Sequence, residues 1–226
     1  MDERLTRTVK LISEEGVKKL FSSYVAIFGV GGVGSFAAEA VARSGVGRIA
    51  IIDGDTVSVS NMNRQLLATV KTLGFPKTEA MGQRICDIAP GVEITKFQGT
   101  YPNIDIDLTD FDFIIDAIDD VKAKVELIVS AKDANIPIIS CMGAGNKLYP
   151  ELFEIADIYE TREDPLARVM RRKLKARGVK DLPVVYSKER LKKTNSDDST
   201  IGSAVFATGT AGLIAAGFAV RQLLKN

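Results

Sequence analysis

The chain has 226 residues, of which 46 % are hydrophobic. This length and composition allow a buried core and are typical of one α/β domain with at most a small appendage. Lys and Arg number 30 and Asp and Glu 29, so the near-neutral charge gives no global sign of a nucleic-acid or membrane partner. Histidine is absent, which excludes a histidine base, a histidine metal ligand and a Ser-His-Asp triad.

The two cysteines, Cys86 and Cys141, form no Cys-x-x-Cys pair. This argues against a disulfide framework and a structural zinc site, and favours the reducing cytoplasm. The N-terminus is charged from its second residue and lacks the apolar run of a secretory signal. We expect Cys86 to lie in the core and Cys141 to be a small packing residue rather than a nucleophile.

Strands and helices are expected to alternate along the first two thirds of the chain. Apolar residues between positions 5 and 21 predict one or two helices before the core. Strands follow at 24–28, 48–53, 92–97, 113–116 and 136–140, with helices at 32–44, 77–89 and 121–134. Apolar strands alternating with helices indicate an α/β, Rossmann-like, doubly wound fold with a mostly parallel central sheet covered on both faces.

After residue 141 the pattern changes. We predict a strand at 152–159, a basic amphipathic helix at 164–178, a short strand at 184–186 and a polar loop at 192–203. The apolar end is read as a strand at 204–208 and a core helix at 210–224. It could just cross a bilayer, but its small residues suit packing on the sheet, so membrane association is not expected. The prediction is a single domain, 1–226, with N-terminal helices, a core at about 24–145 and a C-terminal α/β extension at about 146–226.

A glycine-rich turn follows the first expected strand and opens a helix. Its glycines are Gly29, Gly31, Gly32 and Gly34. Glycine lets backbone amides approach a phosphate, and the helix N-terminus favours negative charge. Asp53, at the end of the next strand, has the spacing of a carboxylate that grips ribose hydroxyls. These features predict a nucleotide, with NAD the leading choice on them alone, and a turn without ligand is less favoured.

A polar loop after Asp53 carries acid, amide and guanidinium groups, at Asp55, Asn61, Arg64 and Gln65. The fork of Arg64 suits phosphate oxygens. A hydride-transfer enzyme has little use for a fixed cation there. A solvated loop with incidental charges explains these residues equally well.

Two further charged residues fit a triphosphate. Lys77, in the first turn of a helix after Pro76, opposes the helix dipole and is easier to explain beside an anion. The alternative is an exposed lysine paired with Glu79 or another acid. Asp119, where the fourth strand ends, is the candidate Mg²⁺ ligand, since Mg²⁺ takes one or two carboxylates plus substrate phosphates. Its neighbour Asp120 is at least as well explained as a helix cap.

Five motifs in order, G-x-G-G-x-G, D-x-D, S-N-x-N-R-Q, P-K and D-x-x-D, lie within about residues 4–145. They resemble the adenylation domain of the ubiquitin-activating-enzyme-like superfamily, which includes the molybdopterin-synthase and thiamine-pathway adenylyltransferases. The resemblance implies a homodimeric ATP-binding domain that makes an acyl-adenylate. It implies nucleotide contacts by Gly32, Asp53, Asn61, Arg64, Lys77 and Asp119. It also implies that Arg7 enters the partner subunit's ATP site, although the residues alone favour a solvated helix face for Arg7.

The second half, at 140–148, 164–168 and 202–203, resembles the tRNA threonylcarbamoyladenosine dehydratases. In that family ATP activates a carboxylate on a modified tRNA adenosine, which then cyclises with net loss of water. An activator of the C-terminal Gly-Gly of a sulfur-carrier protein is the alternative. It is disfavoured because the zinc-binding cysteine pairs of those relatives are missing. A sulfur-transfer partner, a nicotinamide oxidoreductase and a nucleotide-sensing scaffold without turnover remain open.

One stretch, residues 162–193, is strongly basic in an otherwise near-neutral chain. It carries twelve cations, with four acids inside it and Glu160 just before it. Such a stripe predicts an RNA docking surface. A solvated helix face is the competing interpretation, because Tyr186 is almost the only aromatic residue available for stacking.

Overall fold

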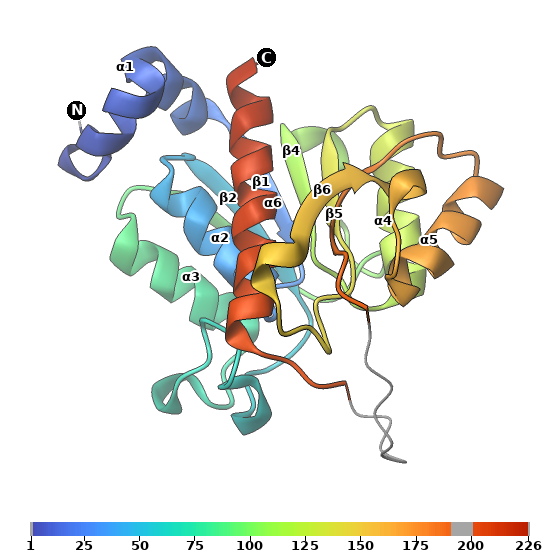
Figure 1. Ribbon diagram of the computed structural model, residues 1–226. Coiled ribbons are helices and arrows are strands. Elements are labelled where there is room, and N and C mark those ends of the chain that lie inside the picture. Colours follow the sequence, from blue (N-terminus) through green and yellow to red (C-terminus); the bar gives the residue numbers. More distant parts are fainter. Residues whose placement is uncertain (1, 191–200, 226) are drawn as a thin grey trace.

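A computed structural model describes residues 2–190 and 201–225. Its centre is a seven-stranded sheet in the order β3-β2-β1-β4-β5-β7-β6 (Figure 1). All neighbouring strands are parallel except β6, which runs antiparallel to β7. The strands are β1 (Tyr24–Phe28), β2 (Arg48–Asp53), β3 (Glu93–Gln98), β4 (Phe113–Asp116), β5 (Ile138–Cys141), β6 (Phe153–Asp157) and β7 (Pro183–Ser187).

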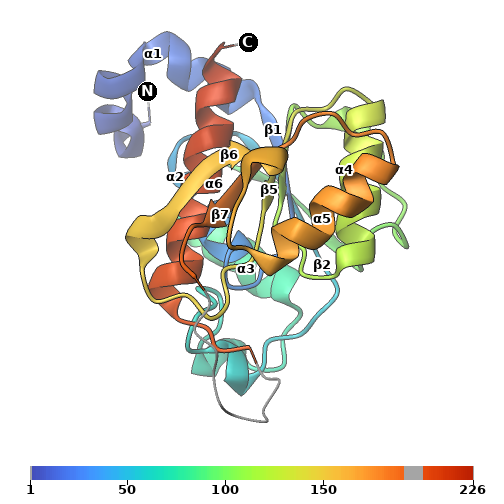
Figure 2. The same ribbon diagram turned by 45° about the vertical axis from the view of Figure 1, so that its right-hand side comes forward.

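Helices cover both faces of this sheet (Figures 1 and 2). One face carries α2, α3 and α6, and the other carries α4 and α5. Between β5 and α5, two short 3-10 turns, η5 (Pro150–Leu152) and η6 (Ile158–Glu160), flank β6. The helices are α1 (Thr6–Ser22), α2 (Gly34–Arg43), α3 (Lys77–Ile88), α4 (Val121–Asp133), α5 (Pro165–Ala176) and α6 (Val205–Lys225).

The strands alternate their side chains between two hydrophobic cores. In β1, Val25 and Ile27 pack in the core under α2, α3 and α6, whereas Ala26 and Phe28 pack in the core under α4 and α5. A parallel strand buried on both faces must be apolar throughout, which is what the sequence of β1 shows. The predicted mostly parallel, doubly wound α/β fold is confirmed.

The C-terminal region corrects one expectation. Residues 204–208 were expected to form a strand, but α6 begins at Val205 and continues without a break to Lys225. A short apolar run does not distinguish a buried strand from a buried helix. Here Gly212 lets α6 lie against the start of α2, since a Cβ at that position would come 2.2 Å from the Val33 carbonyl oxygen. Close helix packing therefore decides the conformation.

The extension completes the sheet, because β7 pairs with β5 and β6 forms the edge. Most of the predicted polar loop at 192–203 lies outside the described residues. Over residues 2–190 and 201–225, no helix combines the length and apolar character needed to cross a bilayer. The sheet order reverses direction between β1 and β4, and ligands of open α/β sheets bind in the crevice beyond the carboxyl ends of strands at such a point.

Candidate nucleotide-binding site

The glycine turn lies at this crevice, between the end of β1 and the start of α2. Gly29 has φ of 84°, and a Cβ there would lie 2.7 Å from the Ala117 carbonyl oxygen. A Cβ at Gly34 would lie 1.7 Å from the Gly29 carbonyl oxygen. Side chains are thus excluded at both ends of the turn. In the described part of the chain, the amides of Gly31 and Gly32 have no acceptor, so they are available for phosphate oxygens.

Asp53 ends β2 and fastens the turn to its neighbouring strand. Its carboxylate accepts the Val30 amide at 2.8 Å and the Asp55 amide at 2.9 Å. Burial raises its pKa, and the attraction of Lys77 and the two amide hydrogen bonds oppose that rise. The predicted ribose contact stays a prediction, and the structure gives Asp53 the additional role of holding the turn in place.

Lys77 opens α3 and is buried rather than exposed. Its Nζ lies 2.6 Å from an Asp55 carboxylate oxygen and 3.8 Å from one of Asp53. The alternative of an exposed lysine paired with an acid is half right: Lys77 pairs with Asp55, but it is buried, and Glu79 pairs instead with Lys96 at 2.7 Å. Two carboxylates therefore hold the ammonium at the carboxyl edge of β2, beside the glycine turn.

The loop at 58–65 is organised by its own hydrogen bonds. The Asn61 amide oxygen accepts the Ser58 backbone N–H at 3.0 Å. Arg64 donates to the Ser60 carbonyl and the Asn63 side chain, both at 3.0 Å, and no carboxylate among the described residues pairs with it. Gln65 is buried, and its Oε1 has no hydrogen-bond partner in the described chain.

Gln65 also faces the glycine turn. Its amide nitrogen lies 3.7 Å from the position that a Cβ at Gly31 would occupy. An unpartnered buried amide beside free backbone amides fits a polar ligand better than a loop with incidental charges. The contacts predicted for Asp55, Asn61, Arg64 and Gln65 themselves stay predictions.

The end of β4 contains a buried ionic cluster that the sequence did not reveal. Lys124 and Asp116 are fully buried and lie 3.0 Å apart, and Ser140 donates to Asp116 at 2.6 Å. Lys124 also donates to the Ile118 carbonyl at 2.8 Å, directly before Asp119. The cluster therefore fixes the turn that carries Asp119. A lysine inside an amphipathic helix gave no signal of this burial.

Asp119 and Asp120 are both exposed at this end of the sheet. Asp120 accepts the Ala123 amide at 2.7 Å and caps α4, as its alternative interpretation held. Asp119 is left as the carboxylate facing solvent beyond β4. Within the described residues, no group of three or more His, Cys, Asp or Glu side chains could hold a metal ion.

The first turns of α6 lie over the glycine turn, and the segment before α6 contacts the loop at 58–65, which the predicted strand at 204–208 did not foresee. The Asn63 side chain donates to the Ser203 carbonyl at 2.9 Å. A Cβ at Gly32 would lie 3.2 Å from Thr208, so α6 limits the space above the turn. In the sequence, only the family resemblance of the dipeptide at 202–203 pointed to this segment.

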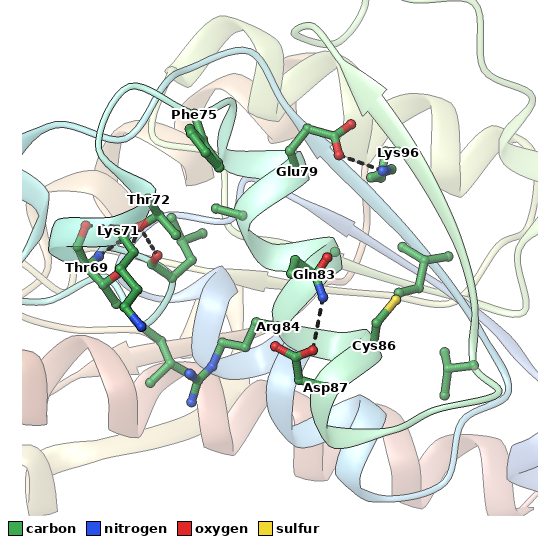
Figure 3. A pocket seen from close by; sticks show the side chains of 16 residues that line it. Thr69, Lys71, Thr72, Phe75, Glu79, Gln83, Arg84, Cys86, Asp87 and Lys96 are labelled. Atoms are coloured by element: carbon green, nitrogen blue, oxygen red, sulfur yellow. Dashed lines mark hydrogen bonds and ion pairs between the residues drawn. The ribbon is translucent and has the colours of Figure 1, made fainter.

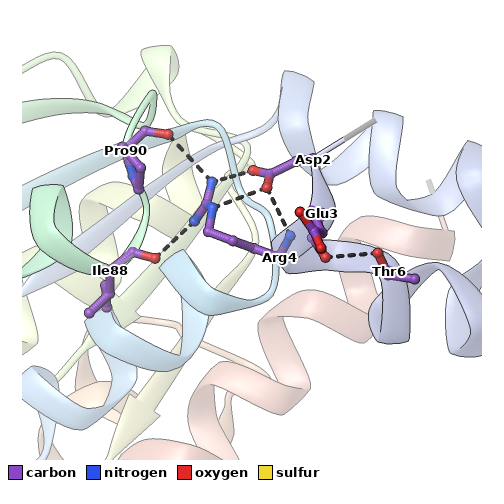
Figure 4. Close-up of polar contacts among 6 residues, drawn as sticks. All are labelled: Asp2, Glu3, Arg4, Thr6, Ile88 and Pro90. Atoms are coloured by element: carbon purple, nitrogen blue, oxygen red, sulfur yellow. Dashed lines mark hydrogen bonds and ion pairs between the residues drawn. The ribbon is translucent and has the colours of Figure 1, made fainter.

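Arg7 is an exposed residue of α1. The N-terminal segment that carries it is held by Arg4, which donates to the Ile88 carbonyl at 2.9 Å and the Pro90 carbonyl at 3.4 Å (Figure 4). Arg4 also pairs with Asp2. α1 changes direction at Ser13, where φ is 67°. The predicted role of Arg7 requires a second subunit and stays a prediction.

A cavity of about 650 Å³ lies elsewhere, on the outer side of α3 (Figure 3). Cys86 lines it together with Gln83 and Asp87, and no residue of the glycine turn does. The expectation that Cys86 lies in the core is wrong, because it is exposed. Met81 and Ile85 point to the core, and the next helical position turns about 100° away from that face. This cavity is not the nucleotide site.

Cys141 matches its expected role. It is buried at the end of β5, and burial raises its pKa to about 12. A thiol that stays protonated is a packing group and not a nucleophile.

The fold and the site together define a Rossmann-like protein with a glycine turn at the switch point of its sheet, the place where ligands of such sheets bind. The chain belongs to the ThiF family, which matches residues 3–225. This confirms the expected superfamily.

Three relatives are informative. The Bacillus subtilis tRNA threonylcarbamoyladenosine dehydratase is 40 % identical over 245 residues, covering 100 % of this chain and 96 % of the relative. A crystal structure of the Escherichia coli tRNA N6-threonylcarbamoyladenosine dehydratase in complex with ATP has a TM-score of 0.87 and 31 % identity, covering 99 % of this chain and 94 % of that one. The E. coli sulfur carrier protein ThiS adenylyltransferase is 32 % identical over 64 % of this chain and 60 % of its own length.

Proposed function

We propose that this chain is an ATP-dependent tRNA threonylcarbamoyladenosine dehydratase. It adenylates the carboxylate of the modified adenosine and then closes a ring with net loss of water. One observation carries the proposal: a glycine turn with free amides lies beside Lys77 and Arg64, in a chain that aligns along its whole length with such dehydratases. The sulfur-carrier activator aligns over a smaller part of the chain.

In the first step, an oxygen of the substrate carboxylate attacks the α-phosphorus of ATP. The bond between the α- and β-phosphates breaks, pyrophosphate leaves, and an acyl-adenylate forms. A nitrogen or oxygen of the same modified base then attacks the acyl carbon and loses its proton, and AMP leaves with the former carboxylate oxygen. The net change in the tRNA is one water lost. No enzyme nucleophile is required, which fits a buried, protonated Cys141.

The catalytic work of the chain is to place and neutralise phosphate charge. The amides of the glycine turn, the guanidinium of Arg64 and the ammonium of Lys77 surround the place where the triphosphate would lie. Asp53 holds the ribose and Asn61 orders the loop that carries Arg64. Asp55 orients the Lys77 ammonium until phosphate competes for it.

Mg²⁺ fits this site as an ion held mainly by phosphates. Asp116 is occupied by Lys124 and Ser140, and Asp120 caps α4. Asp119 would supply one carboxylate, which is enough for Mg²⁺ that keeps waters and binds the triphosphate. When bound, the ion neutralises charge on the leaving pyrophosphate.

The proposal includes a homodimer in which Arg7 of each subunit completes the partner's ATP site. Residues 1–226 act as one adenylation domain, with the extension on the substrate side. The proposed action on tRNA supports a cytoplasmic location. A sulfur-transfer protein partner is compatible with the ThiF family but is not required by this chemistry.

Mass spectrometry of tRNA nucleosides tests the proposal. After incubation of the protein with ATP and tRNA that carries threonylcarbamoyladenosine, we expect that nucleoside to lose one water mass. Arg64→Ala should lower the rate by roughly 100-fold or more, as expected for removal of a charge-stabilising group. Arg43→Ala, which alters an exposed arginine paired with Glu39, should leave the rate unchanged.

Two outcomes would overturn the proposal. Pyrophosphate release with a Gly-Gly sulfur-carrier protein, and none with tRNA, would show that the chain adenylates the alternative substrate. No pyrophosphate release with either, together with NADH binding, would remove adenylation altogether.

A further inference from the structure

A second cavity, of about 590 Å³, lies at the edge of the sheet formed by β6 and β7. Strand β6 contributes Glu154 and Ala156, and β7 contributes Tyr186, with Lys188 just after it. The turn at η6 and the residues after it close the cavity with Tyr159, Glu160, Thr161 and Arg162. None of these residues belongs to the nucleotide site described above.

The part of the cavity formed by Tyr186 and Lys188 lies at the same end of the sheet as the glycine turn. Tyr159 follows the antiparallel strand β6 and lies near the amino end of β7. β7 is parallel to β5, with Cys141 opposite Val185, so Tyr186 and Lys188 lie just beyond the carboxyl end of β5. β1 and β7 are three strands apart in the sheet order. Neighbouring strands are about 4.8 Å apart, which puts β7 roughly 14 Å from β1. A macromolecular substrate that reaches the glycine turn can also reach this cavity.

The lining of the cavity carries two cations, Arg162 and Lys188, and two carboxylates, Glu154 and the exposed Glu160. Arg162 is exposed and has no ion-pair partner among the described residues. Lys188 lies 2.7 Å from Glu154, with half of its side chain exposed. Arg171 on α5 donates to the Thr161 carbonyl at 2.9 Å, which fixes the basic helix against this edge. In Figure 2, α5 lies beside β6 and β7, and its outward positions Arg168, Arg172, Lys173 and Lys175 are exposed.

The wall of the cavity is aromatic. Tyr159 is partly exposed and is fixed by its hydroxyl, which donates to the Val179 carbonyl at 2.5 Å. Tyr186 is buried and donates to Glu154 at 2.8 Å. The sequence offered only Tyr186 for stacking, and the fold adds Tyr159 to the same cavity. This set of side chains suits an unstacked nucleotide. The base can stack on an aromatic ring, the cations can bind phosphate, and a carboxylate can accept hydrogen bonds from the exocyclic amines of the base.

We infer that this cavity binds an unpaired nucleotide of the RNA substrate, close in the chain to the modified adenosine. The base stacks on Tyr159, Arg162 holds an adjacent phosphate, and Lys188 turns from Glu154 to a second phosphate. The basic face of α5 continues the contact along the RNA backbone. This inference rests on the proposed function, and it assigns recognition of the tRNA to a part of the fold separate from the ATP site.

Steady-state kinetics with tRNA as the varied substrate tests the inference. Tyr159→Leu keeps an apolar side chain without an aromatic face, and it should raise KM for tRNA by roughly 5- to 100-fold, the usual range for loss of one base stack. Tyr159→Phe keeps the ring and should stay near the wild-type KM. Arg162→Ala should raise KM for tRNA. It should also reduce the magnitude of the slope of log affinity for tRNA against log salt concentration by about one. KM for ATP should not change in any of these variants.

Lys188→Ala has a matched control at the opposite edge of the sheet. Lys96 on β3 pairs with Glu79 at 2.7 Å, the same distance as the pair between Lys188 and Glu154, and both lysines are partly exposed. We expect Lys188→Ala to weaken tRNA binding and Lys96→Ala to leave it unchanged. Circular dichroism and ATP affinity show whether each variant is folded.

The outcomes separate this inference from the proposed function. If the wild-type protein dehydrates tRNA, and Tyr159→Leu, Arg162→Ala and Lys188→Ala all keep the wild-type KM for tRNA, the cavity does not bind RNA. If the wild-type protein releases no pyrophosphate with tRNA, the proposed function fails first. Equal losses in Lys96→Ala and Lys188→Ala would show a general charge effect and would also overturn the assignment.

Discussion

The two cysteine thiols have opposite environments, and this gives a direct chemical prediction. Cys86 is exposed, whereas Cys141 is buried with its pKa raised to about 12 by burial. Because the thiolate is the reactive form, we expect only one thiol to react quickly with Ellman's reagent in the folded protein at about pH 8. Cys86→Ser should remove that reaction and Cys141→Ser should preserve it.

Unfolding provides the internal standard for the same measurement. In denaturant both thiols should react, because the burial that protects Cys141 is lost. Two thiols of equal reactivity in the folded protein would show that β5 is open at its end, which would contradict the packing role given to Cys141.

Asp164 is the second residue whose environment sets its protonation. It is buried, accepts the Ala167 amide at 2.8 Å and caps α5, while its Oδ2 has no partner in the described chain. Burial raises its pKa above the usual 3.8, against the attraction of Lys147. As pH rises from about 3.8, the unfolded chain therefore releases this proton first, and the free energy of unfolding falls until the folded carboxyl has also ionised.

Asp164→Asn should remove this pH dependence. Asparagine caps a helix about as well as aspartate, so the cap is retained while the buried charge is lost. Urea unfolding at several pH values from about 4 to 7 should show the variant gaining stability relative to the wild type as pH rises. Asp107→Asn gives the opposite control when the pH range is extended below 3.8, because hydrogen bonds from Thr109 lower the pKa of Asp107 and its stabilisation is lost as pH falls there. An unchanged pH slope in Asp164→Asn would contradict the assignment.

At the scale of elements, two glycines of α6 allow a matched comparison. A Cβ at Gly212 would lie 2.2 Å from the Val33 carbonyl oxygen, at the start of α2. A Cβ at Gly217 would meet only the end of the flexible Arg221 side chain, at 3.3 Å. The first contact is with fixed backbone and the second can move aside.

We therefore expect opposite effects from the same substitution. Gly217→Ala should stabilise the protein by up to about 1 kcal/mol, because alanine favours a helix over glycine. Gly212→Ala should destabilise it by about 1–3 kcal/mol through overpacking, and should also weaken ATP binding, since α2 carries the glycine turn. Urea unfolding and nucleotide titration measure both effects. Equal stability of the two variants would show that α2 and α6 separate easily.

At the scale of the whole molecule, most of the sheet could be predicted from sequence. The expected bounds of β1 and β2 agree with the structure because buried parallel strands are continuous apolar runs between turn signals. The glycine turn could be placed because its two flanking elements and the acid after β2 all agreed. The start of α6 could not, since the contact between Gly212 and Val33 joins residues distant in sequence.

The site was predictable as a set of residues but not as an arrangement. The sequence predicted that Lys77 lies at a helix start. It did not predict that Lys77 is buried between two carboxylates, because this depends on how α3 packs beside β2. Lys124 was not found at all, since a buried ion pair needs partners from two strands and a helix. The cavity at Tyr159 and Tyr186 likewise forms only when the extension joins the sheet.

The proposed homodimer makes a prediction that no single chain can test. If Arg7 acts in the partner's ATP site, a heterodimer of Arg7→Ala and Arg64→Ala subunits has one site with both lesions and one site with none. Such a heterodimer, co-expressed with two tags and purified on both, should have about half of the wild-type activity, because a twofold dimer contains two equivalent sites. Each variant alone should be almost inactive.

A heterodimer of Arg64→Ala and Lys77→Ala subunits is the control. Both residues belong to the same subunit's site beside the glycine turn, so each site of this heterodimer carries one lesion and activity should stay low. Recovery in the first pair and not in the second would place Arg7 in trans. If both pairs are equally inactive, with dimers confirmed by light scattering, Arg7 does not act in the partner's site and is a solvated residue of α1.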